Sequence, residues 1–299
     1  MVKNIQRRIN SSSTGNLKTR WIPPYIMLTP GIVLITFFFL LPLTLMVIYS
    51  FYTRVLGGSI EPIFTLDNYL RALTRPLYLK IIFRTLWLAL VTTIITLVLS
   101  YPLSYFLART KSKHKNLLVL AVLFPFWTSI IIRSYAWLVL LGNKGVVNSV
   151  LAGLGLPKVQ LIWNETGVLF GLVQILLPYM ILPLYASISG IKESIEESAR
   201  TLGAGSLVTF MRMTVPLSLP GAATGALLVF ISAMGSFLTP ALLGGPSQIV
   251  IPMLIYEQIA ILNYAFAAAL SMILVFIVLI IVILFDRLVG LERLGGIYG

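Results

Sequence analysis

Apolar residues run through the chain in long stretches that carry no Asp, Glu, Lys or Arg. The charge-free stretches are residues 21–53, 85–108, 116–132, 166–191, 213–256 and 258–285. A helix needs about 20 mostly apolar residues to cross the hydrocarbon core of a bilayer. The pattern predicts an all-α, multi-pass membrane protein with six transmembrane helices, over about 26–52, 82–107, 117–141, 166–190, 219–239 and 260–286.

The stretch 213–256 is too long for a single spanning helix. Its second half contains the run Thr239-Pro-Ala-Leu-Leu-Gly-Gly-Pro-Ser. Proline and glycine are the strongest local signals for turns and helix ends. We therefore expect the chain to turn back at the membrane surface after the fifth helix.

The composition excludes several classes of protein. Hydrophobic residues make up 58% of the chain and charged residues 10%, whereas soluble domains are about 25% charged. The chain has no cysteine, which excludes thiol nucleophiles, disulfides and thiolate metal sites. The single histidine, His114, lies in a basic run and is interpreted as a solvated loop residue. We expect no metal site and no catalytic residue.

The distribution of Lys and Arg predicts the orientation in the membrane. The net charge is +13, which in a soluble protein would suggest a nucleic-acid partner; here we expect none. With the N-terminus inside, the segments facing the cytoplasm hold about twice as many Lys and Arg residues as those outside. Cytoplasmic loops carry such an excess, so both termini are predicted to be cytoplasmic, with the basic tail against anionic lipid.

These predictions divide the chain into four parts. Residues 1–24 form a basic cytoplasmic tail, and residues 25–81 form the first transmembrane helix and an outer loop. Residues 82–287 form a core of five helices that includes the loop 191–220, and residues 288–299 form a C-terminal tail. The outer loop, about 53–81, is interpreted either as a solvated loop or as a contact for an extracytoplasmic protein.

The connection between the fourth and fifth predicted helices begins with an amphipathic segment. A helix that starts here places four apolar residues on one face: Ile191, Ile195, Ala199 and Leu202. Glu196 and Arg200 form a favourable i,i+4 pair on the other face. Gly203 and Gly205 are expected to end this helix.

A second amphipathic segment follows the glycines. Ser206 is placed to cap it. Its apolar face holds Leu207, Phe210, Met211 and Thr214, before Pro216 and Pro220 lead into the fifth helix. Two apolar faces in a cytoplasmic connection are expected to be shielded from water by another surface. Either they lie on lipid or on the protein's own helix ends, or they dock into a cytoplasmic partner.

The loop resembles the EAA loop of ABC importer permeases. That motif reads Glu-Ala-Ala, three residues, Gly, nine residues, then Ile-x-Leu-Pro. The spacing of Glu197, Gly203 and Pro216 matches it. The chain departs from it at three positions, where Ser198, Met213 and Val215 stand for Ala, Ile and Leu.

The resemblance implies that this loop couples the membrane helices to an ATPase subunit. It implies that Glu197 faces basic or polar groups of the ATPase and that Ala199 is small because a partner surface lies close. It implies that Gly203 permits the turn, where a side chain would clash or fix the wrong angle, and that Pro216 sets the start of the next helix. The predicted coupling residues also include Glu193, Arg200 and Leu207.

Other segments are similar to the first permease subunit of spermidine/putrescine-type importers. They are Arg84-Thr-Leu-Trp-Leu-Ala, Phe124-Pro-Phe-Trp-Thr-Ser-Ile-Ile-Ile-Arg-Ser-Tyr-Ala-Trp137 and Gly235-Ser-Phe-Leu-Thr-Pro-Ala-Leu-Leu-Gly-Gly-Pro246. The resemblance implies a type I ABC importer permease fold in the bacterial inner membrane. It also implies a second homologous permease subunit, two ABC ATPase subunits and an extracytoplasmic solute-binding protein. The chain has no Gly-x-x-x-x-Gly-Lys-Ser/Thr loop, so ATP is expected on the partner ATPase and no cofactor on this chain.

Candidates for the translocation path come from the membrane segments. Polyamines need carboxylates for their ammonium groups and aromatic faces for their methylene stems. The aromatic residues available are Phe126, Trp127, Tyr135, Trp137, Tyr179, Tyr185, Phe230 and Phe237. From the membrane segments we select, as path candidates, Trp127, Arg133, Tyr135, Trp137 and Glu257.

Arg133 is the only basic residue inside a predicted span. Either it snorkels or pairs internally with a carbonyl or carboxylate, or it is a gate residue or a contact for an anionic substrate. The second interpretation disfavours polyamines, and sister groups of these permeases carry other small organic ions.

Two other functional classes are weighed against an importer subunit. An intramembrane enzyme needs a buried nucleophile with a base or a metal site, which one loop histidine and the lack of cysteine disfavour. An ion-coupled secondary carrier usually shows ionisable residues or broken helices at mid-membrane in two related halves. No carboxylate is placed at mid-membrane here, since Glu165, Glu257 and Asp286 lie near predicted helix ends.

Overall fold

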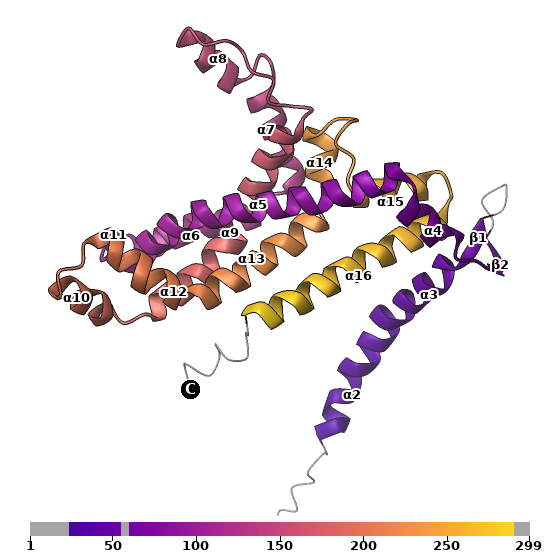
Figure 1. Cartoon of the computed structure of the whole chain (residues 1–299), viewed down its shortest axis with the longest axis horizontal. Helices are drawn as coiled ribbons and strands as arrows, with labels where there is room; N and C mark the ends of the chain where they lie inside the picture. Colours follow the sequence, from indigo (N-terminus) through magenta and orange to yellow (C-terminus); the bar gives the residue numbers. More distant parts are fainter. Residues whose placement is uncertain (1–23, 55–59, 290–299) are drawn as a thin grey trace, which may run out of the picture. The chain divides into compact units, whose positions relative to one another are not determined.

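The computed structural model describes residues 24–54 and 60–289 (Figure 1). Most of the tails predicted over 1–24 and 288–299 therefore lies outside the described residues. The chain divides into two units, Met1–Met46 and Val47–Gly299. The first consists of α2 (Pro24–Ile35), a π turn (Thr36–Leu40) and the start of α3 (Leu41–Ser50). Its large apolar side chains are exposed, as expected of a helix that faces lipid.

The loop predicted after the first helix is folded. A two-stranded antiparallel sheet, β1 (Tyr52–Arg54) and β2 (Ile60–Phe64), is followed by α4 (Asp67–Thr74). The Asn68 side chain donates hydrogen bonds to the carbonyls of Ser50 and Tyr52, both at 3.0 Å. These bonds fix α4 against the end of α3 and the first strand.

Three long helices form the packed centre of the second unit: α5 (Pro76–Arg109), α9 (Glu165–Gly190) and α13 (Leu219–Met234). They lie side by side in Figure 1. The second helix starts earlier than the predicted residue 82 because proline is favoured in the first helical turn. A Cβ on Gly221 would lie 2.4 Å from Ser187 Cβ, so only glycine permits this approach of α13 to α9.

The contact faces of these helices carry small residues. On α5 the buried polar residues are Thr85, Thr92, Thr93, Thr96, Ser100 and Ser104. Several of their hydroxyls donate to the carbonyl one turn earlier, as Thr93 does to Ala89 at 2.7 Å. Small residues let transmembrane helices approach closely where the hydrophobic effect does not drive them together.

The third predicted helix, 117–141, is broken in the structure. It consists of α6 (Lys115–Leu123), a 3₁₀ turn (Phe124–Trp127) and α7 (Ile130–Leu141), followed by α8 (Val146–Gly153). Thr128 is extended, with φ −96° and ψ 139°. Pro125 lacks the N–H that a continuous helix would use at this point, which explains why a continuous helix is the wrong prediction.

The fifth helix ends before its predicted limit of 239. Gly235, a residue of low helix propensity, takes the C-cap position of α13. The chain then turns back as predicted, through α14 (Leu238–Leu243), Gly245 at φ +66°, and α15 (Ile251–Ala260). The last helix, α16 (Tyr264–Val289), packs through its fully buried Phe266 against Tyr78 and Ile251.

The described residues contain five helices that are long and apolar enough to cross a membrane. A sixth is counted if the pair Ser206–Leu217 and Leu219–Met234, which bends by 67°, is taken as one span. The observed set therefore agrees with the predicted class of protein. The main differences from the predicted spans are the early start of the second helix, the break in the third and the early end of the fifth.

Candidate functional site

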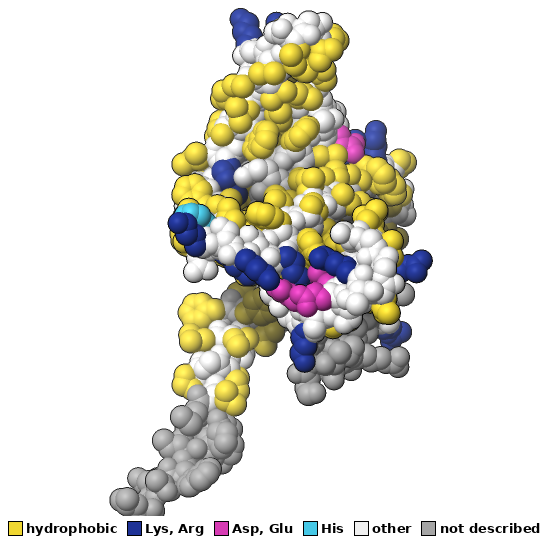
Figure 2. Space-filling model, turned by 90° about the vertical axis from the view of Figure 1, so that its left-hand side faces the viewer, with side chains coloured by type: hydrophobic (Ala, Val, Ile, Leu, Met, Phe, Trp, Pro, Cys, Tyr) yellow, Lys and Arg dark blue, Asp and Glu magenta, His cyan; other side chains and the backbone are white. Residues whose placement is uncertain are grey.

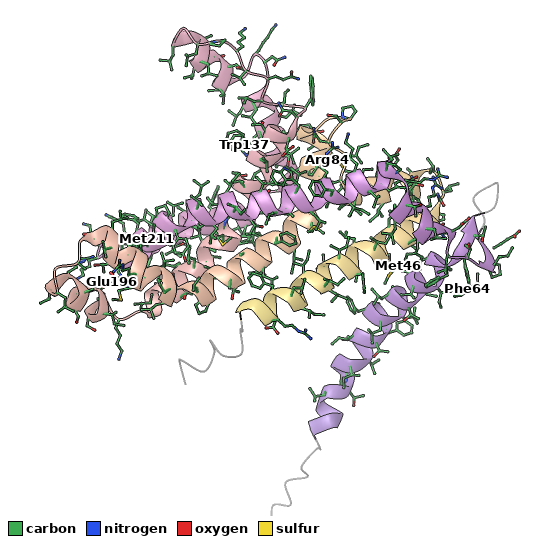
Figure 3. All side chains as sticks on the ribbon, in the orientation of Figure 1. Met46, Phe64, Arg84, Trp137, Glu196 and Met211 are labelled. Carbon is green, nitrogen blue, oxygen red and sulfur yellow. The ribbon has the colours of Figure 1, made fainter. Side chains whose placement is uncertain are left out.

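The loop between α9 and α13 consists of two short helical segments joined at a glycine. The first is α10 (Glu193–Thr201). The second contains α11 (Ser206–Thr209), a π turn (Phe210–Thr214) and α12 (Val215–Leu217). Pro216 therefore lies immediately before α13. Figure 3 labels Glu196 and Met211, one on each segment.

Gly203 ends the first segment in a left-handed conformation. Its φ is +89°. Its N–H bonds to the Arg200 carbonyl at 2.9 Å, and the Ala204 N–H bonds to the Ala199 carbonyl at 3.1 Å. This pair of bonds is the Schellman motif. A Cβ on Gly203 would meet no atom within 4 Å, so within this chain the requirement for glycine is conformational and not steric.

The predicted cap of the second segment is wrong. Gly205 is the residue that precedes α11, and Ser206 is its first helical residue. Of the predicted apolar face, Thr214 is buried and Phe210 is partly buried, but Leu207 and Met211 are exposed. Thr209, which the prediction left off this face, is buried.

The predicted faces of the first segment are also corrected. Ile191 precedes α10 and Leu202 follows it, so the four apolar residues do not share one helical face. Ile191 and Ala199 are buried, but Ile195 and Leu202 are exposed. Glu196, predicted on the outer face, is only 4% exposed. Its predicted pair with Arg200 is present at 4.0 Å.

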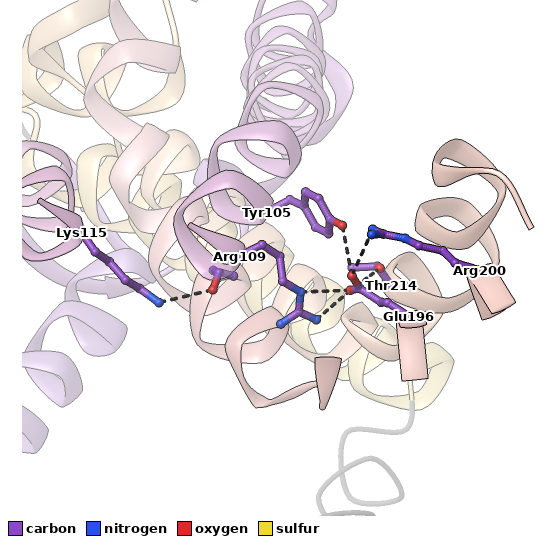
Figure 4. A network of polar contacts seen from close by, with 7 residues as sticks. Tyr105, Arg109, Lys115, Glu196, Arg200 and Thr214 are labelled. Carbon is purple, nitrogen blue, oxygen red and sulfur yellow. Dashed lines mark hydrogen bonds and ion pairs between the residues drawn. The ribbon is translucent and has the colours of Figure 1, made fainter. Parts of the chain in front are cut away.

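The carboxylate of Glu196 is the centre of a polar network (Figure 4). Its Oε1 accepts hydrogen bonds from Arg109 Nη2 at 2.7 Å and Arg109 Nε at 3.1 Å. The same oxygen accepts from Thr214 Oγ1 at 3.0 Å, and Oε2 accepts from the Tyr105 hydroxyl at 3.1 Å. The pattern of apolar positions gave no signal for this network, because Arg109 and Glu196 lie far apart in the sequence.

The network keeps Glu196 ionised. Burial by itself raises the pKa of the Glu196 carboxyl, because a charge is disfavoured away from water. The hydrogen bonds from Arg109, Thr214 and Tyr105 and the positive charge of Arg109 act in the opposite direction and outweigh burial. The pKa of Glu196 therefore lies below its ordinary value. Removing one partner of a buried ion pair typically costs about 3–5 kcal/mol.

The outer surface of the loop carries the other predicted coupling residues. Glu197 and Arg200 are exposed, and exposed Glu193 pairs with Lys111 at 3.6 Å. Figure 2 shows acidic side chains gathered beside Lys and Arg side chains at this end of the molecule. Large apolar side chains are exposed next to them, Leu202 by 89% and Leu207 by 71%.

A second feature is a cavity of about 430 Å³ between the break in the third span, α9 and the end of α13. It is lined by aromatic, hydroxyl and apolar side chains, among them Phe126, Thr128, Arg133, Tyr179, Ser232, Ser236, Phe237 and Thr239. The rings of Phe126 and Tyr179 meet edge to face with centroids 5.0 Å apart. None of the residues that line the cavity is Asp or Glu.

Arg133 is the one predicted path residue that lines this cavity. Its Nε and Nη1 are buried and have no hydrogen-bond partner among the described residues. Trp127 is 70% exposed, and Tyr135 and Glu257 are exposed as well. Trp137 packs elsewhere, stacked on Phe170 and donating to Gln174 Oε1 at 3.3 Å.

Three curated relatives are similar to the chain. The spermidine/putrescine transport system permease protein PotB of Escherichia coli K12 is 38% identical over 253 residues, which covers 84% of this chain and 92% of PotB. The Haemophilus influenzae protein of the same name is 35% identical over 254 residues, covering 84% and 88%. The inner membrane ABC transporter permease protein YdcU of Escherichia coli K12 is 33% identical over 250 residues, covering 79% and 80%. No family model matches the chain.

Solved structures agree with the fold. A bacterial ABC transporter that imports the acidic polysaccharide alginate superimposes with a TM-score of 0.76 at 20% identity, covering 97% of this chain and 98% of that one. The same kind of transporter in complex with its alginate-loaded periplasmic protein gives a TM-score of 0.75. The chain has the fold of an ABC importer permease and is a multi-pass inner-membrane transport component, not an enzyme. It belongs to the family of spermidine/putrescine-type permease subunits of ABC importers.

Proposed function

We propose that this chain forms half of the translocation path of an ATP-driven importer for polyamines such as spermidine and putrescine. The observation that carries the proposal is the 38% identity to PotB over 84% of the chain. The cavity next to α7 supports it, since Phe126, Tyr179 and Phe237 offer aromatic faces. Such faces attract ammonium groups and pack on methylene stems.

The loop from α10 to α12 is the surface on which an ATPase subunit docks. Leu202 and Leu207 are large apolar side chains that contact little of their own chain. Exposed apolar patches edged with polar residues are typical of protein interfaces. Glu197 lies beside them with no ion pair among the described residues, so its charge is free to meet a basic group of the partner.

The complete importer contains two ATPase subunits, a second permease subunit and an extracytoplasmic binding protein. Support for the last comes from the alginate importer, whose structure includes its periplasmic protein. ATP binds to the ATPase subunits, since the sequence of this chain has no phosphate-binding loop of the Gly-x-x-x-x-Gly-Lys-Ser/Thr type. The importer lies in the bacterial inner membrane with both termini of this chain in the cytoplasm.

A second candidate substrate is another small organic ion, one that carries a negative group. The observation that favours it is Arg133, which lines the cavity and has two buried guanidinium nitrogens without a hydrogen-bond partner in the part of the chain that the structure describes. An anionic group would satisfy them, whereas a polyamine would not.

Uptake of labelled putrescine and spermidine tests the proposal. Bacteria that lack their own polyamine importers would express the chain with its co-encoded partners. Leu207→Asp is the matched control, because it alters an exposed docking residue without disturbing the packed helices. We expect uptake with the unmodified chain and at least a tenfold loss with Leu207→Asp. An assembled complex that takes up neither polyamine would contradict the polyamine assignment and favour the second candidate.

A further inference from the structure

The first helix of the loop is attached to the rest of the chain through very few side chains. Within α10 the buried residues are Glu196 and Ala199. Ala199 offers only a methyl group for packing. Glu196 offers a carboxylate held by donors from other elements. The carboxylate is therefore the main side-chain attachment of α10 to its own chain.

The donors to this carboxylate come from two separate elements. Arg109 is the last residue of α5, and Tyr105 lies one turn before it. Thr214 ends the π turn that leads into α12 and α13. One side chain thus joins α10 to the end of the second span and to the start of the fifth. Three hydrogen bonds converge on Oε1 alone, which fixes the position of α10 against both.

Aromatic packing supports the same junction. The Phe210 ring of the π turn meets Tyr105 and Tyr101 of α5 edge to face, with centroids 5.2 Å and 6.0 Å apart. The Tyr101 hydroxyl lies 3.3 Å from Ser218 Oγ at the start of α13. The second segment of the loop is therefore held along the last turns of α5, beside the carboxylate of Glu196.

A neighbouring ion pair shows a different kind of contact. Lys111 and Glu193 also join the end of α5 to α10, at 3.6 Å. Their side chains are 84% and 49% exposed, whereas those of Arg109 and Glu196 are 14% and 5% exposed. An exposed pair is screened by water and holds its geometry weakly. Of these two ion pairs, the buried one is the pair that can keep α10 and α5 together as one body, with the Tyr105 hydroxyl bonded to the same carboxylate.

We propose that Glu196 and Arg109 form the link through which displacement of α10 moves the second span. Both are positioning residues: they contact neither ATP nor the transported solute. The inference rests on the proposed function, in which an ATPase moves the loop from outside. When α10 is pushed, the carboxylate carries the displacement to α5 and, through Thr214, to α13. Without the link, α10 moves and the spans do not follow.

The test compares transport with ATP hydrolysis in the assembled importer. The complex, purified with its ATPase and binding protein, would be reconstituted in proteoliposomes. Uptake of labelled putrescine and spermidine and release of phosphate would be measured in the same vesicles. The variants are Glu196→Gln, which keeps the shape of the side chain and removes its charge, and Arg109→Lys, which keeps the charge and removes donors. Lys111→Gln is the matched control, because it breaks the exposed pair with Glu193 while Lys111 itself lies outside the docking loop.

For Glu196→Gln we expect full assembly with the ATPase, basal ATP hydrolysis within twofold of the unmodified complex, and solute transported per ATP reduced at least tenfold. Arg109→Lys should lie between Glu196→Gln and the unmodified complex, and Lys111→Gln should match the unmodified complex within twofold. The double variant Glu196→Gln with Arg109→Gln should lose no more than Glu196→Gln alone, because both changes break one link.

Several outcomes would overturn the inference. Unchanged transport per ATP in Glu196→Gln would show that the pair carries no displacement. A parallel loss of assembly, hydrolysis and transport would show that the pair only stabilises the fold. If Glu196→Gln does not assemble, Arg109→Lys decides: normal transport per ATP in that variant would also show that the pair carries no displacement. An unmodified complex that assembles but neither hydrolyses ATP in response to its loaded binding protein nor transports would instead contradict the proposed function.

Discussion

At the scale of single residues, Glu196 and Glu197 are adjacent carboxylates with opposite surroundings. Glu196 is buried among Arg109, Tyr105 and Thr214, whereas Glu197 is exposed. Successive residues of a helix point about 100° apart, so one faces the protein while the next faces outward. The motif spacing predicts Glu197 as a coupling residue, whereas its neighbour Glu196 makes the hydrogen bonds to other elements of the chain.

The lowered pKa of Glu196 predicts how the stability of the loop depends on pH. A carboxyl whose pKa is lower in the folded than in the unfolded state stabilises the fold above the unfolded value of about 4.3. That contribution is lost as the pH falls through the folded value. We expect the contribution of Glu196 to the unfolding temperature of the detergent-solubilised protein to be constant from pH 8 to 5. At pH values below about 4 this contribution should decrease, and the unfolding temperature should decrease with it.

Glu196→Gln provides the control for this pH dependence. With no charge at this position the variant should be less stable at neutral pH, and the gap to the unmodified protein should narrow as the pH falls below 4. The measurement is thermal unfolding followed by circular dichroism. A gap that is constant across the whole pH range would contradict the assignment of the lowered pKa to Glu196.

Substitutions at Arg133 are expected to have opposite effects on the two candidate classes of substrate. Two unit charges 6 Å apart repel by about 3 kcal/mol at an effective dielectric constant of 20. A polyamine that passes the cavity meets this barrier. Arg133→Gln should then raise polyamine uptake or lower its KM several-fold, while Arg133→Lys should leave both nearly unchanged. If the solute carries a negative group, Arg133→Gln should instead reduce its uptake at least tenfold, as measured with labelled solutes.

At the scale of elements, the turn between α10 and α11 depends on the left-handed conformation of Gly203. A β-branched residue is strongly disfavoured at φ +89°. Gly203→Val is expected to destabilise the loop by about 1–2 kcal/mol and to change the angle between its two helices. Uptake should therefore fall at least tenfold, while insertion in the membrane, measured by protein level in the membrane fraction, stays normal.

Gly205 is the matched control for this prediction. It precedes α11 with φ −67°, and a Cβ there would meet no atom within 4 Å. Gly205→Ser should therefore keep uptake within about twofold of the unmodified chain, because Ser is favoured at a helix N-cap. Equal losses in Gly203→Val and Gly205→Ser would show that the loop is sensitive to any added side chain, and the conformational explanation would be wrong.

The elements also show what the sequence could and could not predict. Long charge-free stretches predicted the class of protein, because apolar length follows directly from membrane thickness. The break at Thr128 was missed, because Pro125 lies inside an apolar run that is long enough to read as one helix. The burial of Glu196 was missed because its partner Arg109 comes from another helix, and periodicity within one segment carries no information on such contacts.

At the scale of the whole molecule, the structure joins two loops that the charge pattern places on one side of the membrane. Arg109 and Lys111, which end and follow α5, pair with Glu196 and Glu193 of α10. The loop after the second span and the loop after the fourth therefore lie at the same end of the helices. The excess of Lys and Arg predicts that this end faces the cytoplasm.

The length of α5 allows that orientation to be tested. Its 34 residues make a helix about 51 Å long, which exceeds the hydrocarbon thickness of about 30 Å. Its two ends therefore lie on opposite sides of the membrane. Thr74 precedes the outer predicted end and Lys113 follows the inner one, and both are exposed. The chain has no cysteine, so single cysteines at these positions can be labelled without background.

With the termini in the cytoplasm, Thr74→Cys should react with a membrane-impermeant maleimide in intact spheroplasts. Lys113→Cys should react only after lysis. A third single-cysteine variant, Glu197→Cys, should behave like Lys113→Cys. The reverse pattern would contradict the predicted orientation while leaving the fold unchanged. It would also remove the docking surface from the compartment that contains ATP, so the position of these three residues decides whether the loop can meet an ATPase at all.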